Sequence, residues 1–374
     1  MQPFDFQPST RVVFGENTLD QLGSVAKELA GDRVLIVTDP GIVKVGIVER
    51  AIQSLKKKSL DAFVFDGVAE NPTTRHVENG VRFAVETASA AKPINLIIGL
   101  GGGSAMDCAK GINFLLTNGG VMEDYWGMDK APKPMLPAIG IPTTAGTGSE
   151  AQSFALIAQE KTHIKMACGD KKARFRTVIL DSILTQSVPR HVAAATGIDA
   201  ISHAIESYVT TRRNPISQMF AREAWRLLEE GFEITLSHPE NAKARSQMLL
   251  GAHLAGVAIE NSMLGAAHAC ANPLTAKYGI THGVAVGLML PHVVRFNNQV
   301  VEGFYQELQP SKPLHERIAE LKTAAVLPER LRDFQIDSED LPQLAKQAAG
   351  QWTGKFNPRP VSETELLQLY KATY

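Results

Sequence analysis

The first half of the sequence alternates short apolar runs with segments of helical periodicity, which restricts the possible folds strongly. Five runs have the length of strands and are bounded by Gly, Pro or Asp: residues 33–39, 61–67, 94–100, 136–142 and 176–181. Helical patterns such as residues 73–90 lie between several of them. Such alternation predicts a mostly parallel sheet covered by helices. The opening stretch FDFQPSTRVVFG, residues 4–15, is predicted to form a hairpin.

The rhythm changes after about residue 185, where strand-like runs become rare. Residues 215–236 and 241–262 carry the 3.6-residue periodicity of helices. We therefore predict an α/β domain over residues 1–187 and an all-helical domain over residues 188–374.

Composition excludes several classes of protein. The net charge of −1 lacks the basic footprint of a nucleic-acid-binding protein. No run of about 18 apolar residues predicts a membrane span, and the first ten residues do not resemble a signal peptide. The three cysteines have no CxxC spacing, which favours a reducing cytoplasm and leaves histidine and carboxylate as the ligands for any metal.

A glycine-rich turn follows the run at residues 94–100, in INLIIGLGGGSAMDCAKGINFLL. Gly101, Gly102 and Gly103 let a ligand approach the backbone closely. Ser104, followed by Asp107, matches a helix start whose N–H groups would face an anion such as a pyrophosphate. A plain tight turn is the alternative, because Ser104 stands where G-x-G-x-x-G has its last glycine.

Asp39 ends the first α/β strand, in LIVTD. An acid there can accept hydrogen bonds from an adenosine ribose and repel a 2′-phosphate, which favours NAD over NADP. This acid precedes the glycines, unlike the order of the usual dinucleotide fingerprint. The alternative is a turn residue before Pro40 and Gly41.

The stretch IPTTAGTGSE, residues 141–150, also follows a strand and is rich in hydroxyl groups. Its candidates for contacts to a nucleotide's phosphates or nicotinamide amide are Thr143, Thr144, Thr147 and Ser149. An ordinary polar loop explains the same composition.

Four side chains could hold a metal ion. Asp199 and His203, in GIDAISHAIE, are four residues apart and share one helical face. His268 and His282 lie among small residues further along the chain. One carboxylate and three imidazoles suit a divalent first-row metal, Fe(II) or Zn(II), and do not distinguish the two.

These motifs together resemble the iron-containing (group III) alcohol dehydrogenases, and the resemblance covers nearly the whole chain. It implies a two-domain architecture like that of dehydroquinate synthase, with a dinucleotide-binding α/β domain and a helical domain. The family's metal ligands carry over to Asp199, His203, His268 and His282. Its cofactor contacts carry over to Asp39, Gly101, Gly102, Gly103, Ser104, Thr143, Thr144, Thr147 and Ser149, and Lys165 matches a lysine near the cofactor ribose.

Two positions depart from the family pattern H-x-x-x-H-P-L-G, Asn272 and Thr275, and the first of them bears on the chemistry. This chain has His268 followed at the second histidine's place by Asn272, before Pro273. In the family that histidine lies close to the nicotinamide, and asparagine cannot titrate. A proton-relay role at this position is therefore not expected here.

The resemblance implies a cytoplasmic, homodimeric or larger enzyme that interconverts a small primary alcohol or diol and its aldehyde. NAD(H) would carry the hydride and a divalent metal, Fe(II) before Zn(II), would bind the alkoxide. A metal- and NAD-dependent lyase or cyclase of the dehydroquinate-synthase type is the alternative. A non-catalytic nucleotide-binding protein is a third hypothesis, which the complete ligand set disfavours.

Overall fold

The computed structural model describes residues 3–8, 10–87, 92–162 and 164–374, so residue 9 of the predicted hairpin and residues 88–90 of the predicted helix lie outside it. Contacts divide the chain into two compact units. An α/β unit comprises Gln7–Thr144 and Ser149–Ser187. A helical unit comprises Val188–Tyr374, the start of the chain up to Phe6, and Ala145–Gly148.

The α/β unit is built on a six-stranded sheet in the order β1-β9-β6-β4-β2-β3, and every pair in it is parallel. Its strands are β1 (Arg11–Phe14), β2 (Arg33–Val37), β3 (Asp61–Phe65), β4 (Leu96–Gly101), β6 (Ala138–Pro142) and β9 (Thr177–Leu180). The five predicted runs are five of these strands. The predicted parallel sheet is thereby confirmed.

The predicted hairpin at the start of the chain is wrong. The only strand in that stretch, within the described residues, is β1, which pairs in parallel with β9 from Arg11 opposite Thr177 to Phe14 opposite Leu180. The partner strand lies more than 160 residues away, so no local turn signal marks the pairing. β1 is an edge strand, and the side chains of Val12 and Phe14 remain exposed.

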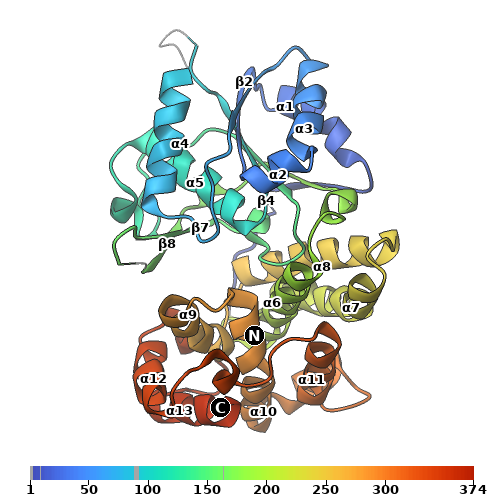
Figure 1. The fold of residues 1–374 in the computed structure, drawn as a ribbon, viewed down its shortest axis with the longest axis vertical. Coiled ribbons are helices and arrows are strands. Elements are labelled where there is room, and N and C mark those ends of the chain that lie inside the picture. The colour runs from blue at the N-terminus through green and yellow to red at the C-terminus, as the bar shows by residue number, and fades with distance from the viewer. Residues whose placement is uncertain (1–2, 9, 88–91, 163) are drawn as a thin grey trace. The chain divides into compact units, whose positions relative to one another are not determined.

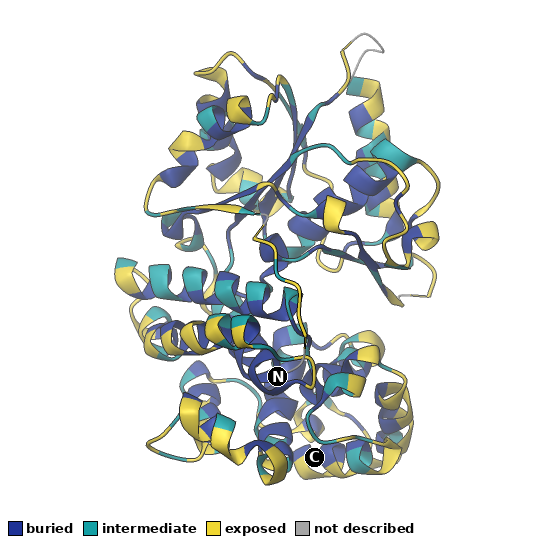
Figure 2. Cartoon of the chain, turned by 180° about the vertical axis from the view of Figure 1, so that it is seen from behind, coloured by how far each residue is buried: buried dark blue, intermediate teal, exposed yellow. Residues whose placement is uncertain are grey.

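Helices cover both faces of the sheet (Figure 1). On one face α1 (Leu22–Glu28) and α3 (Ile47–Lys56) share a core with alternate residues of the central strands. On the other face α5 (Gly103–Asn118) packs on β4, and α4 (Thr74–Thr87) packs on α5. The central strands are consequently buried along their length, as Figure 2 shows.

Two features of the α/β unit were not predicted. A short helix, α2 (Pro40–Lys44), follows β2 directly. A second sheet, in the order β5-β8-β7, consists of β5 (Gly127–Met128), β7 (Phe154–Ala158) and β8 (Lys165–Gly169).

The helical unit contains no β-strand in its described residues, as predicted. Its helices are α6 (Arg190–Val209), α7 (Pro215–Ser237), α8 (Ala242–Glu260), α9 (Ala266–Tyr278), α10 (His282–Leu308), α11 (Leu314–Ala325), α12 (Leu341–Ala349) and α13 (Glu363–Thr373). The two helices predicted over 215–236 and 241–262 are α7 and α8. α6 packs against α7, α8 and α10 and is buried without interruption from Gly197 to Val209.

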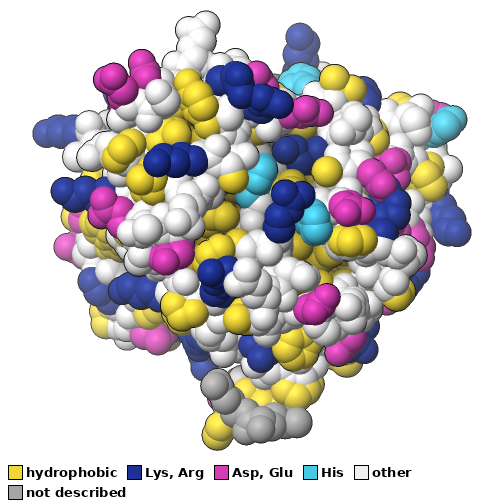
Figure 3. Space-filling view, turned by 90° about the horizontal axis from the view of Figure 1, so that it is seen from below, with side chains coloured by type: hydrophobic (Ala, Val, Ile, Leu, Met, Phe, Trp, Pro, Cys, Tyr) yellow, Lys and Arg dark blue, Asp and Glu magenta, His cyan; other side chains and the backbone are white. Residues whose placement is uncertain are grey.

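The surface of the chain carries both signs of charge. On the face seen in Figure 3, basic and acidic side chains are intermixed and neither forms a continuous field. Within the described residues, no helix combines the length and apolar character needed to cross a lipid bilayer.

Candidate metal and cofactor sites

Three polar side chains follow one another along a single face of the buried helix α6. Asp199, His203 and Glu206 are spaced i, i+4 and i+7, and each residue is at most 5% exposed. Because an unpaired buried charge is costly, polar groups on a helix that is buried on all sides need partners from neighbouring elements. The partners come from the first turns of α9 and α10.

His268 is the third residue of α9, and His282 is the first residue of α10. The position of α10 depends on Gly283, whose backbone lies directly against α6. A Cβ atom on Gly283 would lie 2.0 Å from the carbonyl oxygen of Ala195 and 3.3 Å from Cβ of Asp199. Only glycine lets the start of α10 approach the Asp199 turn this closely.

The structure brings all four predicted metal-binding side chains together. From Asp199 Oδ1 the distance is 3.5 Å to His203 Nε2, 3.5 Å to His268 Nε2 and 3.9 Å to His282 Nε2. The rings of His203 and His268 stack with centroids 4.9 Å apart. The ligand atoms of Asp199, His268 and His282 all lie within 4.8 Å of one another; His203 is not part of this mutually close group, although its Nε2 is 3.5 Å from Asp199 Oδ1.

The chemistry of this cluster fits a cation. Asp199 Oδ1 and His268 Nε2 are buried and have no hydrogen-bond partner, although they face each other at 3.5 Å. That distance is too long for a hydrogen bond of normal strength. It matches the separation of about 3.4 Å between two ligand atoms that each lie about 2.1 Å from a tetrahedral ion. A divalent ion would satisfy both atoms at once.

The electrostatics of the cluster also favour positive charge. Burial opposes ionisation of Asp199, but the three histidines outweigh it and hold the pKa of Asp199 below its usual value. Burial lowers the pKa of His268, yet Glu206 and Asp199 outweigh it and raise that pKa to about 9. Burial keeps the pKa of His203 below its usual value, which favours the neutral imidazole that binds metals.

Most of the predicted cofactor residues lie at the carboxyl edge of the large sheet, namely Asp39, Gly101, Gly102, Gly103, Ser104, Thr143 and Thr144. Strands β2, β4 and β6 are parallel neighbours, so the loops that follow them share one edge. From β2 the chain proceeds to β3 on one side and then to β4 on the other, which makes the gap between β2 and β4 a topological switch point. Ligands of open α/β sheets bind at such points.

Asp39 and the glycine turn meet at this switch point. Asp39 Oδ1 accepts hydrogen bonds from the backbone N–H groups of Gly41 and Ile42 at 2.9 and 3.1 Å and so caps α2. A Cβ on Gly101 would lie 3.3 Å from Asp39 Oδ2, and the φ of Gly101 is +149°. The sheet order therefore places the acid beside the glycines that follow it in sequence.

The glycine turn continues into α5 and lies beside the hydroxyl-rich loop. Gly102 is the N-cap of α5, and Gly103 and Ser104 form its first turn. The N–H of Thr143 donates to the carbonyl of Gly101 at 2.9 Å, and a Cβ on Gly102 would lie 3.5 Å from Thr144 Oγ1. These two loops thus present backbone amides and hydroxyl groups side by side.

The helix predicted after the glycine turn is present, but Ser104 does not cap it, because the N-cap is Gly102. Asp107 is buried inside this helix, where it accepts a 2.5 Å hydrogen bond from Ser149 Oγ. Lys110 completes this cluster, because its Nζ lies 2.7 Å from the carbonyl oxygen of Ser149 and 2.6 Å from that of Phe154. Ser149, predicted as a cofactor contact, here joins its loop to α5.

Thr147, Lys165 and Asn272 belong to three different parts of the structure. Thr147 groups with the helical unit, in the segment Ala145–Gly148. Lys165 is exposed at the first position of β8, in the second sheet. Asn272 lies one turn after His268 on α9, where its Nδ2 donates to Oε1 of Gln351 at 3.0 Å.

Two residues of these sites were missed in the sequence. Glu206 bonds to His268, and its i+7 spacing from Asp199 on one helical face was a usable signal. Lys110 stands in the apolar helix sequence AMDCAKGINFLL, where a lysine needs buried partners.

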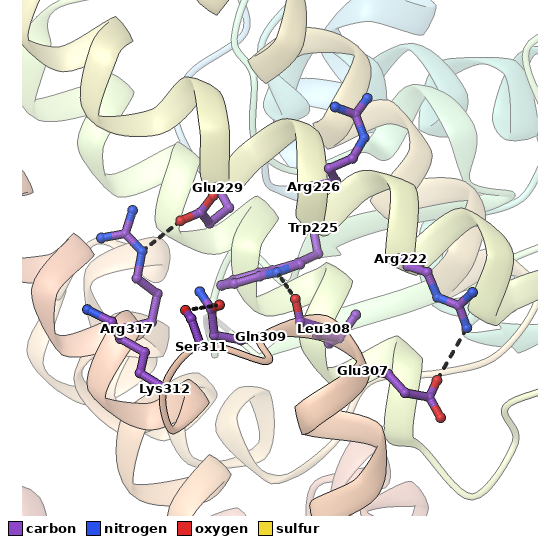
Figure 4. Close-up of a pocket in the computed structure, with 10 residues that line it drawn as sticks. All are labelled: Arg222, Trp225, Arg226, Glu229, Glu307, Leu308, Gln309, Ser311, Lys312 and Arg317. Atoms are coloured by element: carbon purple, nitrogen blue, oxygen red, sulfur yellow. Dashed lines mark hydrogen bonds and ion pairs between the residues drawn. The ribbon is translucent and has the colours of Figure 1, made fainter.

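A separate cavity of about 660 Å³ lies in the helical unit and contains none of the predicted site residues (Figure 4). Its cationic side chains are matched by carboxylates: Arg317 pairs with Glu229, and Arg222 pairs with Glu307. Trp225 donates its indole N–H to the carbonyl of Leu308. The cavity is a salt-bridged surface hollow and adds nothing to the metal cluster.

Two family models match the chain almost end to end. The model described as iron-containing alcohol dehydrogenase matches residues 9–182, and the model of the family's C-terminal part matches residues 193–374. The chain belongs to the iron-containing alcohol dehydrogenase family. The family predicted from the sequence motifs is therefore confirmed.

Curated relatives and solved structures agree with this assignment. Alcohol dehydrogenase 4 of Schizosaccharomyces pombe is 34% identical over 96% of this chain and 86% of that protein. The 1,3-propanediol dehydrogenase of Citrobacter freundii is 31% identical over 99% of both chains. The crystal structure of sulfoacetaldehyde reductase from Bifidobacterium kashiwanohense in complex with NAD+ superposes with a TM-score of 0.91, at 26% identity over 100% of this chain and 99% of that one.

Family membership, with relatives that include an NAD-dependent methanol dehydrogenase of Bacillus methanolicus, makes this chain a metal-dependent, NAD-linked oxidoreductase of the alcohol dehydrogenase type, as predicted. The lyase or cyclase alternative finds no support among these matches. The two-domain fold is confirmed as well, by the parallel sheet and the helical unit and by their match to solved family members.

Proposed function

We propose that this enzyme interconverts small primary alcohols or diols and their aldehydes with NAD(H), on a divalent ion bound by Asp199, His203, His268 and His282. The observation that carries the proposal is the pair of buried, unpartnered ligand atoms, Asp199 Oδ1 and His268 Nε2, that face each other at 3.5 Å. Relatives named as propanediol, methanol and alcohol dehydrogenases support small alcohols and diols as the substrate class.

When bound, the ion would act as a Lewis acid on the substrate oxygen, and NAD would accept the hydride. The chain's residues prepare this chemistry. Asp199 would supply negative charge to hold the ion, and it is buried together with His203 and His268, in a low-dielectric place where that attraction would be strong. His282 is the most open of these four side chains, with 27% of its surface exposed, so a substrate would approach the ion from its side.

We assign cofactor binding to the α/β domain, residues 1–187, and metal binding to the helical domain, residues 188–374. The switch point between β2 and β4 supports the first assignment, because Asp39 and the glycine turn meet there. Gly101, Gly102, Gly103 and Ser104 would receive the pyrophosphate, and Asp39 the ribose. Thr143, Thr144 and Thr147 remain candidates for contacts to the phosphates or nicotinamide, together with Ser149 and Lys165.

Turnover with a defined metal tests the proposal. Protein stripped of metal and reloaded with Fe(II) or Zn(II) is assayed for NADH formation from a panel of primary alcohols and diols. We expect turnover only with metal, and expect His268→Ala to lose both metal and turnover. His238→Ala is the matched control, since His238 is exposed at the end of α7. Turnover by metal-free protein, or by His268→Ala at the wild-type rate, contradicts the proposal.

We also propose that the enzyme is a cytoplasmic homodimer. All three cysteines are free thiols, which suits a reducing compartment. The exposed edge strand β1, with the apolar Val12 and Phe14, is a surface that a second copy would cover. Light scattering of the purified protein tests the dimer, and a monomeric mass at micromolar concentration contradicts it.

A further inference from the structure

Glu206 is a buried carboxylate that does not belong to the predicted metal-binding set. Its side chain is 4% exposed, and both of its oxygens have partners. Oε2 lies 2.5 Å from His268 Nδ1, and Oε1 accepts a 2.8 Å hydrogen bond from the backbone N–H of Ala267. One carboxylate therefore holds both a metal-binding ring and the backbone that carries it.

The first turn of α9 depends on this arrangement, because its own N-cap residue cannot supply a cap. That residue is Gly265, and a Cβ there would lie 2.9 Å from both Glu206 Oε1 and Asn357 Oδ1. The N–H of Ala266 donates to Asn357 at 3.2 Å, as that of Ala267 does to Glu206. Two residues distant in sequence thus replace the local cap that a helix start normally requires.

The second cap connects α9 to the helix that carries His282. Asn357 and Asn297 on α10 exchange two hydrogen bonds, at 3.0 and 2.7 Å, and both residues are buried. Glu206 stands on α6, which carries Asp199 and His203. Glu206 is therefore the cap of α9 that also contacts a metal-binding ring, whereas the side chain of Asn357 bonds only to Ala266, Asn297 and Arg359 among the described residues.

We propose that Glu206 is a positioning residue of the metal site, which keeps the hydrogen of the His268 imidazole on Nδ1 and holds the first turn of α9. The unpartnered Nε2 of the ring, which faces Asp199 Oδ1 at 3.5 Å, would then be the nitrogen that binds the ion. Hydrogen bonds from carboxylates to metal-binding imidazoles orient the ring in the same way in other metalloproteins. This inference rests on the proposed function, because it assumes an ion at the Asp199 cluster.

Glu206→Gln separates this role from a general structural one. The amide keeps the shape of the side chain, and its oxygen can still accept from Ala267. Its NH2 group then faces His268 Nδ1, which must act as an acceptor, so the ring hydrogen moves to Nε2 and blocks the metal. Asn357→Ala is the matched control, since it removes one cap of the same helix and leaves the carboxylate–imidazole contact.

The experiment measures Zn(II) affinity by competition with a chromogenic chelator, together with the melting temperature of the metal-free proteins. We expect Glu206→Gln to lower the affinity about 10- to 100-fold. We expect Asn357→Ala to lower the melting temperature while its affinity stays within about threefold of the wild type. Glu206→Asp, which keeps the carboxylate, should bind Zn(II) more tightly than Glu206→Gln.

Wild-type affinity in Glu206→Gln, or weaker binding by Glu206→Asp than by Glu206→Gln, overturns the inference. An equal loss of affinity in Asn357→Ala also overturns it, because helix capping alone would then explain the effect. Failure of the wild-type protein to bind Zn(II) would instead refute the proposed function, so the two failures are distinguishable.

Discussion

Replacing Gly283 with alanine tests whether the close approach of α10 to α6 creates the metal site. The added Cβ would lie 2.0 Å from the carbonyl oxygen of Ala195 and 2.7 Å from its carbon. Contacts shorter than about 3.0 Å are not tolerated, so the start of α10 must move by about 1 Å. Both contacting atoms belong to the backbone, so no side-chain rotation relieves the clash.

Two consequences of different size follow from that movement. Overpacking of this kind costs about 1–3 kcal/mol of folding free energy, which corresponds to a fall of several degrees in melting temperature. Metal–ligand distances tolerate only about 0.2 Å, so a shift of about 1 Å removes His282 from the ion. We therefore expect Zn(II) affinity and NADH turnover to fall at least about tenfold in Gly283→Ala, while the protein remains folded.

The assay is Zn(II) competition with a chelator, with thermal melts of metal-free and metal-loaded protein beside it. Gly303→Ala in the same helix is the matched control, because no atom lies within 4 Å of the added Cβ. The control should keep wild-type affinity and lose no stability. Wild-type Zn(II) affinity in Gly283→Ala would refute the packing argument for the site.

Three further predictions concern charge, thiols and the cofactor. Burial and nearby cations lower the pKa of His292 to about 4, so its contribution to stability is present above about pH 6.5 and is lost as the pH falls towards 4. The free energy of unfolding in urea should therefore fall less between pH 6.5 and pH 4 in His292→Gln than in the wild type, by at most about 3 kcal/mol. Parallel curves of unfolding free energy against pH for the two proteins would count against this. Burial raises the pKa of Cys108, Cys168 and Cys270, that of Cys168 to about 12. Native protein at pH 8 should therefore resist alkylation by iodoacetamide until it is unfolded, and rapid labelling of any of the three cysteines would contradict this. Asp39→Gly should bring the NADP to NAD ratio of kcat/KM closer to one, and an unchanged ratio would remove Asp39 from cofactor selection.

The parallel sheet was predictable because strands buried on both faces are continuous apolar runs. β4 shows this directly, since it is apolar throughout and buried along its length, and β2 does so from Val34 to Val37. β1 was placed in a hairpin because its partner is distant in sequence and its exposed residues carry no alternating pattern. The strands β7 and β8 were missed although they are also rich in apolar residues.

For the candidate site too, features set by local sequence were predictable, and features set by tertiary packing were not. The spacing of Asp199 and His203 follows from helix geometry alone, so it was visible in the sequence. The convergence of His268 and His282 depends on how three helices pack. Their small neighbours made them candidate ligands in the sequence, and the family resemblance then assigned them to the same ion. The hydrogen bond from Ala267 to Glu206 forms only because α9 packs beside α6, so the sequence alone does not show it. The hydrogen bond from Ser149 to Asp107 depends in the same way on where α5 lies.

The central claim is that one divalent ion is held by one carboxylate and three imidazoles of the helical unit. Anomalous diffraction from crystals of the iron- or zinc-loaded enzyme, recorded at the absorption edge of that metal, tests it most directly. The account predicts one strong peak per chain, within about 2.3 Å of Asp199 and of the Nε2 atoms of His203, His268 and His282. A peak that lies elsewhere, or no peak in enzyme that turns over NADH, would contradict the account.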